Sequence, residues 1–531
     1  MRIRARDQWN WRNFLMCFGV STGMIAFSFP ASVIGTTLAQ PSFLTYMNLL
    51  DDQGVWSSQA TPLIGAMSGI FQAGGVFGII GVSYIMEKWG CKMAVYACSI
   101  IGLIGGALVC ASQNVGMFVA FKFLAGMSSW AFIAITPVYT SEIAPPALRG
   151  LSVGMNGVGI AIGYALATYM GLAFYHSTNM STQWRGPYGV SLIFTALPMM
   201  IVPFIPESPR WLLMRNRVDD AKQVVRSLHN LSNNDEHHFA IVEFYQMQKQ
   251  IEYDRTLSPS YWQLFKRASY RKRLIMSTGY AALGQSTAIL VINNYGPLLY
   301  SVLGYDTEQQ LELQCGWITC GIVGNLTGAL IMDKVGRKPL MIFGIGGCLA
   351  CLIVEAALVA TYANPVPAEP NKAALRAAVA AFYIFVFIYG CGVDVAGIVF
   401  YAEIYPNHLR PKGLALTVAS TCLASLVYLQ VAATAFANIG WKFYLVFISI
   451  CAVGLLWISI VLPETKGIPL EEVAALFGDQ EEVMVFTEDL QLGDGEDEIV
   501  VKDHHRERHS QEQIGKETEE TVHQEVVKIS M

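Results

Sequence analysis

The residues best suited to chemistry in this sequence are charged, and they recur in pairs with one spacing. Glu142 precedes Arg149 by seven residues and Glu403 precedes Arg410 by seven, with proline inside each interval. Opposite charges of this kind form ion pairs that hold a protein in one conformation and release it in another. An exposed pair contributes only about 0–1 kcal/mol, so a useful bias needs several pairs.

Two further motifs recur at almost the same distance along the chain. E-K-W-G-C-K at 87–92 returns as D-K-V-G-R-K at 333–338, and P-E-S-P-R at 206–210 returns in part as P-E-T-K-G at 463–467. The repetition predicts that the chain consists of two related halves. It also predicts a gate, a set of ion pairs that form in one conformation and break in another, made of Glu142, Arg149, Glu207, Arg210, Asp333, Arg337, Glu403 and Arg410. For any one of them, the alternative is a charge that only anchors a helix end and sets topology.

The composition indicates which kind of secondary structure positions these charges. Hydrophobic residues make up 53% of the 531 residues and charged residues only 14%, too little charge to solvate a globular surface. A membrane-spanning helix needs about 20 mostly apolar residues. Segments of that kind lie at about 14–37, 62–85, 93–112, 117–140, 151–174, 188–205, 274–300, 313–332, 339–361, 375–402, 413–437 and 442–462. We therefore predict an all-α membrane protein with twelve transmembrane helices in two six-helix pseudo-repeats.

The basic residues predict the orientation of these helices. The loops after odd-numbered helices hold only Arg185, Lys372, Arg376 and Lys442 of the 35 Lys and Arg residues, and Lys122 lies inside the fourth helix. Basic residues concentrate on the cytosolic side of membrane proteins. We therefore expect both termini and all the repeated motifs to be cytosolic, in a multi-pass protein of the plasma membrane. Asn179, in an N-x-S motif on the other side, is a predicted glycosylation site.

The same pattern divides the chain into five parts. We predict a cytosolic N-terminus at 1–13, an N-terminal half at 14–206, a cytosolic linker with short helices at 207–273 and a C-terminal half at 274–463. Residues 464–531 are predicted to be a cytosolic and largely disordered tail, because the segment from Gly478 onward is acidic and poor in aromatic residues.

Polar residues within the apolar segments are candidates for a substrate site. Asp394 lies nine residues before Glu403, so it is about 13 Å deeper in a helix. Ionisable groups at that depth are costly and usually functional. Gln285, Asn293 and Asn294 share the seventh helix. The alternatives are that Asp394 only shapes a cavity and that the amides bond neighbouring helices. For Glu355 a structural role is favoured, and Lys122 is interpreted as extending to the membrane surface.

The repeated motifs resemble those of the sugar porters of the major facilitator superfamily, and especially their fungal branch. P-E-S-P-R at 206–210, D-K-V-G-R-K at 333–338, P-E-T-K-G at 463–467 and Arg149-Gly150 carry the resemblance, which extends over roughly 14–478. It implies the major facilitator fold and alternating access, in which two halves rock about a central cavity. It also adds candidates, so the predicted substrate-binding residues are Asn156, Gln285, Asn293, Asn294, Tyr295 and Asp394.

The chain departs from that family at several substrate positions. Proton-coupled members carry Gly-Tyr-Asp in the first helix, where this chain has Ser28-Phe29-Pro30. The usual fifth-helix glutamine aligns with Gly157, beside Asn156, and Leu290 and Ile398 replace other polar or tryptophan positions. The first inner-loop motif has Cys91 in place of the family's arginine. These departures favour facilitative transport and weaken the match to a glucose site.

Three functions are compatible with these observations. The first is a secondary transporter for a sugar or related small polar solute, acting as a monomer. The second is the same mechanism with a less polar organic or secondary metabolite as cargo, and the third is a nutrient receptor that does not transport. The sequence has no phosphate-binding loop, nucleophile motif or metal-spaced His/Cys cluster, so we predict no enzyme activity, cofactor, metal or nucleic-acid partner.

Overall fold

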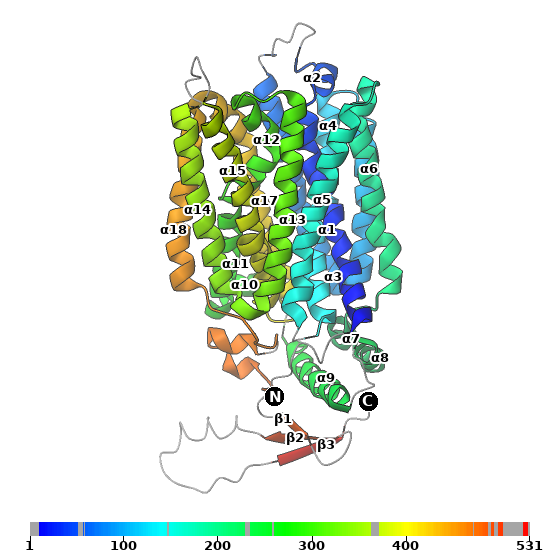
Figure 1. The fold of residues 1–531 in the computed structure, drawn as a ribbon. Coiled ribbons are helices and arrows are strands. Elements are labelled where there is room, and N and C mark those ends of the chain that lie inside the picture. The colour runs from blue at the N-terminus through cyan, green and yellow to red at the C-terminus, as the bar shows by residue number, and fades with distance from the viewer. Residues whose placement is uncertain are drawn as a thin grey trace.

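A computed structural model describes the chain at residues 10–50, 57, 59–145, 148–228, 234–257, 260–362, 371–470, 472–486, 490–492, 498–502 and 524–528. Within these residues ten apolar helical segments are long enough to cross a membrane. Ala60–Cys110 and Arg410–Val461, of 51 and 52 residues, are each long enough for two passes. Eight single and two double segments give the twelve predicted passes. The prediction of an all-α membrane fold is confirmed (Figure 1).

The N-terminal half begins earlier than predicted, at Trp11. Its helices are α1 (Trp11–Leu38), the short α2 (Pro41–Tyr46), α3 (Ala60–Cys110), α4 (Val115–Ile143), α5 (Arg149–Tyr175), α6 (Met180–Ile201) and the short 3-10 helix η2 (Val202–Phe204). Gly90 has a non-helical φ of 90° and divides α3 into two passes. A positive φ favours glycine because a Cβ would clash with the backbone, so the kink depends on this residue.

The C-terminal half contains two interrupted passes. Its helices are α11 (Ala268–Gln285), α12 (Ile289–Val302), α13 (Thr307–Val335), α14 (Arg337–Tyr362), α15 (Lys372–Tyr389), the π-helical η3 (Gly390–Asp394), α16 (Val395–Glu403), α17 (Arg410–Ile439), the 3-10 helix η4 (Gly440–Lys442) and α18 (Phe443–Val461). The seventh pass breaks between α11 and α12, where Ala288 has a φ of 70°. The tenth pass contains η3, and π-helical turns occur frequently at functional sites. The halves meet where α17 packs on α3 and α13 packs on α5.

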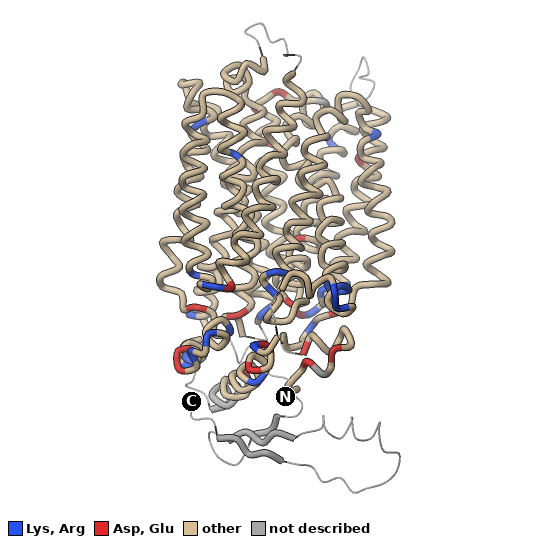
Figure 2. Tube along the Cα trace, turned by 180° about the vertical axis from the view of Figure 1, so that it is seen from behind, with Lys and Arg blue, Asp and Glu red and all other residues tan. Residues whose placement is uncertain are grey.

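The linker and the tail lie at one end of the bundle, which we call the terminal face. The linker contains α7 (Pro209–Met214), α8 (Val218–Leu228), α9 (Asn234–Asp254) and α10 (Tyr261–Lys266). Figure 1 shows α7 to α9 at the same end of the bundle as the first turns of α1. Lys and Arg gather there in Figure 2, while few are found along the rest of the bundle. Large apolar side chains are exposed on the outer helices, for example Val453 at 69% and Ile460 at 81%, as expected for helices solvated by lipid.

In the tail, which composition predicts to be largely disordered, the structure describes short helices and strands over part of the segment. Residues 472–486 include the 3-10 helices η5 (Val473–Phe477) and η6 (Gln480–Glu482). Farther on, β1 (Leu490–Leu492), β2 (Glu498–Lys502) and β3 (Gln524–Lys528) form an antiparallel sheet in that order, in which Val500 pairs with Gln491 and Val526. The reason is local: β2 and β3 contain runs of Val and Ile, which favour strands even within an acidic segment.

Candidate functional site

Two glutamates at the terminal face occupy matching positions in the two halves. Glu207 accepts hydrogen bonds of 3.1 and 3.2 Å from the backbone N–H groups of the two residues after Gly90. Glu464 accepts two bonds of 3.0 Å from the two residues after Gly336, whose φ is 108°. Each carboxylate therefore caps the start of a helix in its own half. Burial raises the pKa of the Glu207 carboxyl, and the backbone N–H groups that bond it act in the opposite direction.

Other charges at this face join the two halves. The contacts are Arg410 Nη1 to Glu142 Oε1 at 3.4 Å, Leu151 N–H to Asp333 Oδ2 at 3.0 Å, and Lys412 Nζ to Glu87 Oε2 at 2.6 Å. Asp333 accepts its bond at the first turn of α5, where the helix dipole favours a carboxylate. The structure therefore holds the halves together at the terminal face.

The remaining predicted gate residues lie beside these contacts. Arg337 pairs with Glu403 at 2.9 Å and with Asp333 at 3.2 Å, both within the C-terminal half. Arg210 donates to the backbone oxygen of Glu142 at 3.4 Å, and Arg149 is buried at the start of α5. The predicted gate residues thus lie in one layer. Glu142, Asp333 and Arg410 join the two halves, and other members of the set contact these residues.

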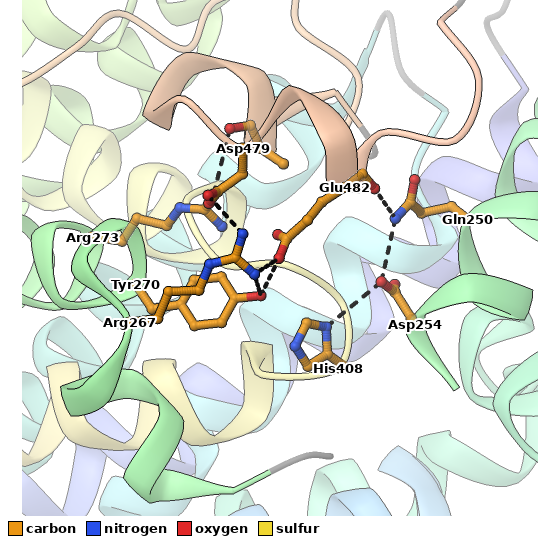
Figure 3. A network of polar contacts seen from close by, with 9 residues as sticks. Gln250, Asp254, Arg267, Tyr270, Arg273, His408, Asp479 and Glu482 are labelled. Carbon is orange, nitrogen blue, oxygen red and sulfur yellow. Dashed lines mark hydrogen bonds and ion pairs between the residues drawn. The ribbon is translucent and has the colours of Figure 1, made fainter. Parts of the chain in front are cut away.

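The linker and the tail form a second layer of polar contacts, on the side of the first layer that faces away from the helical bundle. Figure 3 shows tail residues Asp479 and Glu482 among Arg267, Tyr270 and Arg273. Arg273 Nη2 lies 2.7 Å from Asp479, the Tyr270 hydroxyl donates to Glu482 at 2.6 Å, and Arg267 pairs with both acids. These bonds attach the tail to the terminal end of α11.

The same tail segment also holds linker helix α9. Gln250 Nε2 donates to the Glu482 backbone oxygen at 2.8 Å, and Gln246 donates to Glu472 at 3.0 Å. At the other end of the linker, Asn13 Nδ2 in α1 donates to the backbone oxygen of Leu228 at 3.3 Å. The linker therefore contacts the N-terminal half through Leu228 and the C-terminal half through Asp254, which lies 3.6 Å from His408. It crosses the terminal face between these two contacts.

A central cavity of about 90 Å³ lies between the halves, deeper in the bundle than the gate. Its polar lining includes Tyr164, Gln285, Tyr389, Asp394, Tyr401 and Thr421. Its apolar lining includes Phe27, Trp130, Ile133, Ile160, Leu290 and Ile398. Both interruptions of the C-terminal half border it, since Gln285 ends α11 and Asp394 ends η3. Ligand pockets usually measure about 300–1,000 Å³, so the cavity must widen to admit a solute.

Contacts between the halves also lie on the side of this cavity away from the terminal face. Ser32 Oγ donates to Asn293 Oδ1 at 3.2 Å, and the Tyr169 and Thr319 hydroxyls are 2.6 Å apart. A Cβ added at Gly35 would lie 3.0 Å from the Asn293 backbone oxygen, so α1 and α12 touch closely here. The central cavity is therefore bounded by contacts between the halves on both sides.

The predicted substrate residues are distributed over four places. Gln285 and Asp394 line the central cavity, Asn293 joins α1 to α12, and Asn294 and Tyr295 line a larger cavity beyond it. Asn156 lies elsewhere, buried between α4 and α5, where its amide donates to Thr140 and to the Val153 backbone oxygen. It lines neither cavity, so its aligned position alone does not place it at the site.

Sequence reasoning misjudged Lys122 and overlooked the aromatic side chains of the central cavity. Lys122 does not reach the surface: it is 1% exposed, donates to the Pro30 backbone oxygen at 3.0 Å and lies 5.0 Å from the ring centres of Phe71 and Tyr188. The expectation failed because the azimuth of a side chain around its helix depends on how neighbouring helices pack. The aromatic residues Trp130, Tyr389 and Tyr401 carry no motif that distinguishes them from core residues.

The described residues can also be examined for metal binding and for cysteine chemistry. In the described part of the chain, no three His, Cys, Asp or Glu residues lie close enough to hold a metal ion. All eleven cysteines are free, including Cys348 and Cys351, which have the C-x-x-C spacing of some redox and metal sites. The polar side chains of the central cavity come from both halves, Tyr164 from the N-terminal half and the others from the C-terminal half.

Comparison with known proteins identifies the family. The sequence profile described as Sugar (and other) transporter matches residues 16–477. The chain belongs to this family. The resemblance stated from the motifs is thereby confirmed, and the protein is a secondary transporter by family. Relatives include the MFS-type transporter criB of Aspergillus cristatus, 28% identical over 476 residues that cover 89% of this chain and 95% of that protein.

Two other comparisons extend this finding. The quinate permease of Emericella nidulans is 26% identical over 496 residues, covering 90% of both chains. Among solved structures, the proton:xylose symporter XylE bound to 6-bromo-6-deoxy-D-glucose matches with a TM-score of 0.75 and 22% identity. The match covers 88% of the present chain and 100% of the XylE chain. The inward open conformation of XylE from E. coli matches with a TM-score of 0.62 and 20% identity, covering 87% and 99%. These structures establish the fold.

Proposed function

We propose that this transporter carries a small ring-shaped solute with several hydroxyl groups, a sugar or a cyclic polyol acid, by alternating access. The observation that supports it is the central cavity, which both halves line and which contacts between the halves bound on either side. Opening one set of contacts while the other stays closed would expose the cavity to one side of the membrane at a time.

The lining of the cavity favours a solute with one polar and one apolar face. Gln285, Thr421 and three tyrosines supply hydrogen-bonding groups, while Trp130 and Phe27 supply aromatic surface at a ring separation of 4.7 Å. Relatives named quinate permease make a cyclic polyol acid a candidate beside a sugar, and the carboxylate of such a solute must lie away from Asp394. A less polar organic molecule is the second candidate, because Leu290 and Ile398 line the same cavity.

We propose facilitative transport, with Asp394 serving the substrate rather than a proton. Pro30 occupies the position of the family's proton-carrying carboxylate and cannot titrate. Asp394 lies in the cavity beside Tyr389 and Tyr401, where its carboxylate can accept hydrogen bonds from substrate hydroxyl groups.

Uptake into proteoliposomes tests both parts. A labelled panel of glucose, xylose, inositol, quinate and an aromatic metabolite should show saturable uptake of a hydroxylated ring, slowed at least about tenfold by Asp394→Asn. Uptake should equilibrate and not concentrate when a pH gradient is imposed. Accumulation that a protonophore abolishes would overturn the facilitative mechanism. Saturable binding of a panel member without any uptake would favour the receptor.

We further propose that the terminal face is cytosolic, that the protein resides in the plasma membrane and that one chain is the working unit. The basic residues at that face support the orientation (Figure 2). Asn179, exposed at the start of α6, should carry a glycan when the protein is made in a eukaryotic cell. Asn230 lies outside the described residues, in the linker, and should carry none. Glycan on Asn230 but not on Asn179 would reverse the orientation.

A further inference from the structure

A second and larger cavity lies toward the face opposite the termini. It measures about 550 Å³ and is bordered by the ends of α1 and α17, by α12 and by α14. It shares no lining residue with the central cavity. The contact of Ser32 with Asn293, and a 3.0 Å bond from the Tyr295 hydroxyl to the Leu429 backbone oxygen, lie near its inner boundary. The two cavities are therefore separate.

An acidic side chain without a partner lines this cavity. Glu355 in α14 is 2% exposed, and neither of its carboxylate oxygens has a hydrogen-bond partner among the described residues. Its situation differs from that of the buried Glu403, which receives bonds from Arg337 and Thr465. A buried carboxylate without hydrogen bonds costs several kcal/mol or more, so its retention in a membrane segment points to a ligand.

Asn294 adds a second buried acceptor to the lining. Asn294 is 4% exposed and donates its amide N–H to the Leu290 backbone oxygen at 2.9 Å. Its amide oxygen has no partner in the part of the chain that the structure describes. A carboxylate and an amide oxygen both accept hydrogen bonds. A ligand that satisfies these two side chains must therefore supply donors.

Aromatic side chains complete the lining. Phe382, Phe436, Trp441 and Tyr444 border the cavity, each from a different helix. Aromatic faces attract cations and, with a carboxylate, form the usual surroundings of an organic ammonium group. A neutral polyol would satisfy the acceptors but leave the charge of Glu355 uncompensated, and an organic acid would be repelled. The volume lies within the range of small-molecule sites.

We propose that this cavity is a second binding site, for a protonated organic amine whose ammonium group bonds Glu355 and whose apolar part lies among the aromatic side chains. The site is independent of the solute carried through the central cavity. Because Asn294 and Tyr295 belong to α12, a bound amine contacts the helix that closes the central cavity against α1.

Calorimetry on the purified full-length protein in lipid nanodiscs tests the site. Phenethylammonium is the probe, and 3-phenylpropionate and 3-phenylpropanol are its anionic and neutral counterparts of similar shape. The amine should bind saturably and the other two at least about tenfold more weakly. Glu355→Gln, which keeps the side-chain volume, should weaken the amine roughly ten- to hundredfold. Asp394→Asn, in the central cavity, should leave its affinity unchanged.

A second variant leaves the acid in place and removes the space. Ala433→Trp adds a large side chain from α17 to the lining and should abolish amine binding. It also provides the decisive result if Glu355→Gln does not fold. Equal binding of the three probes, or amine binding unaffected by filling the cavity, would overturn the proposal. So would a lack of amine binding together with a pH dependence of uptake that Glu355→Gln removes, which would make Glu355 a proton-carrying group.

Discussion

The two halves carry the same cluster of charges at the terminal face but use it differently. In the C-terminal half, Glu403 pairs with Arg337 and accepts a hydrogen bond from Thr465, so its charge is compensated within the half. In the N-terminal half, Glu142 accepts a bond from Ser208, which matches Thr465, but its ion pair is with Arg410 of the other half. Glu403 therefore stabilises the C-terminal half, whereas Glu142 stabilises the closed interface between the halves.

One substitution between the copies accounts for this difference. Cys91 stands where the C-terminal copy has Arg337, and both are buried, at 4% exposure. A thiol cannot neutralise Glu142, and the ion pair of this carboxylate with Arg410 crosses the interface. Where the C-terminal half has an internal ion pair, the N-terminal half therefore has an ion pair that joins the two halves.

Removing the cation that crosses the interface should have the largest effect. Arg410 is 0% exposed, and breaking a buried ion pair from one side costs about 3–5 kcal/mol. Arg410→Gln should therefore open the terminal face and lower uptake at least about tenfold. A cysteine introduced at Val418, which lines the central cavity, should react faster with an impermeant maleimide from the terminal face. Arg376→Gln, at an exposed position on α15, should change neither quantity. Unchanged labelling in Arg410→Gln would reduce this arginine to a helix anchor.

Displacing Asp333 should have the next largest effect. A Cβ at Gly150 would lie 1.9 Å from Asp333 Oδ1, so Gly150→Ala must push the carboxylate away from the start of α5. We expect uptake to fall about three- to tenfold, which corresponds to about 0.7–1.4 kcal/mol, the net contribution of a typical hydrogen bond. Gly189→Ala is the matched control, because a Cβ there meets nothing within 4 Å. In an Asp333→Gly background the alanine should have no further effect, and full additivity would show that it acts elsewhere.

Restoring the missing arginine should make the two copies alike. In Cys91→Arg, the new guanidinium competes with Arg410 for Glu142, and terminal-face labelling at Val418→Cys should rise about two- to fivefold. Combined with Arg410→Gln it should recover protein stability but not uptake, since the introduced guanidinium neutralises Glu142 without joining the halves. Thermal unfolding and uptake separate these effects. Cys91→Ser controls for loss of the thiol, and recovered uptake in the double variant would contradict our account of Cys91.

The smallest effect is expected at the most exposed contact. The side chains of Glu87 and Lys412 are 36% and 12% exposed, and such a pair contributes about 0–1 kcal/mol. Each single charge reversal should lower uptake less than about fivefold, and Glu87→Lys with Lys412→Glu should restore it. The single variants should also lose part of the salt dependence of uptake. If the double reversal is no better than either single one, the two side chains do not act on each other.

The sequence by itself determined the architecture, because hydropathy, charge asymmetry and repeated motifs are local signals. Twelve apolar segments, the linker helices and the matched positions of Glu142 and Glu403 followed from composition and spacing alone. The family followed from the same motifs. The predicted site at Asp394 followed from the depth of an acid in an apolar segment, and it stays a prediction until transport is measured.

Only the tertiary structure decided which side chains meet. Arg410 and Glu142 are 268 residues apart, and nothing in their local sequence says that they pair while Glu403 turns to Arg337. Lys122 was misjudged for the same reason, since helix depth can be read from sequence but the direction in which a side chain faces cannot. That direction is set by how α1, α4 and α5 pack, and packing is a property of all the helices together.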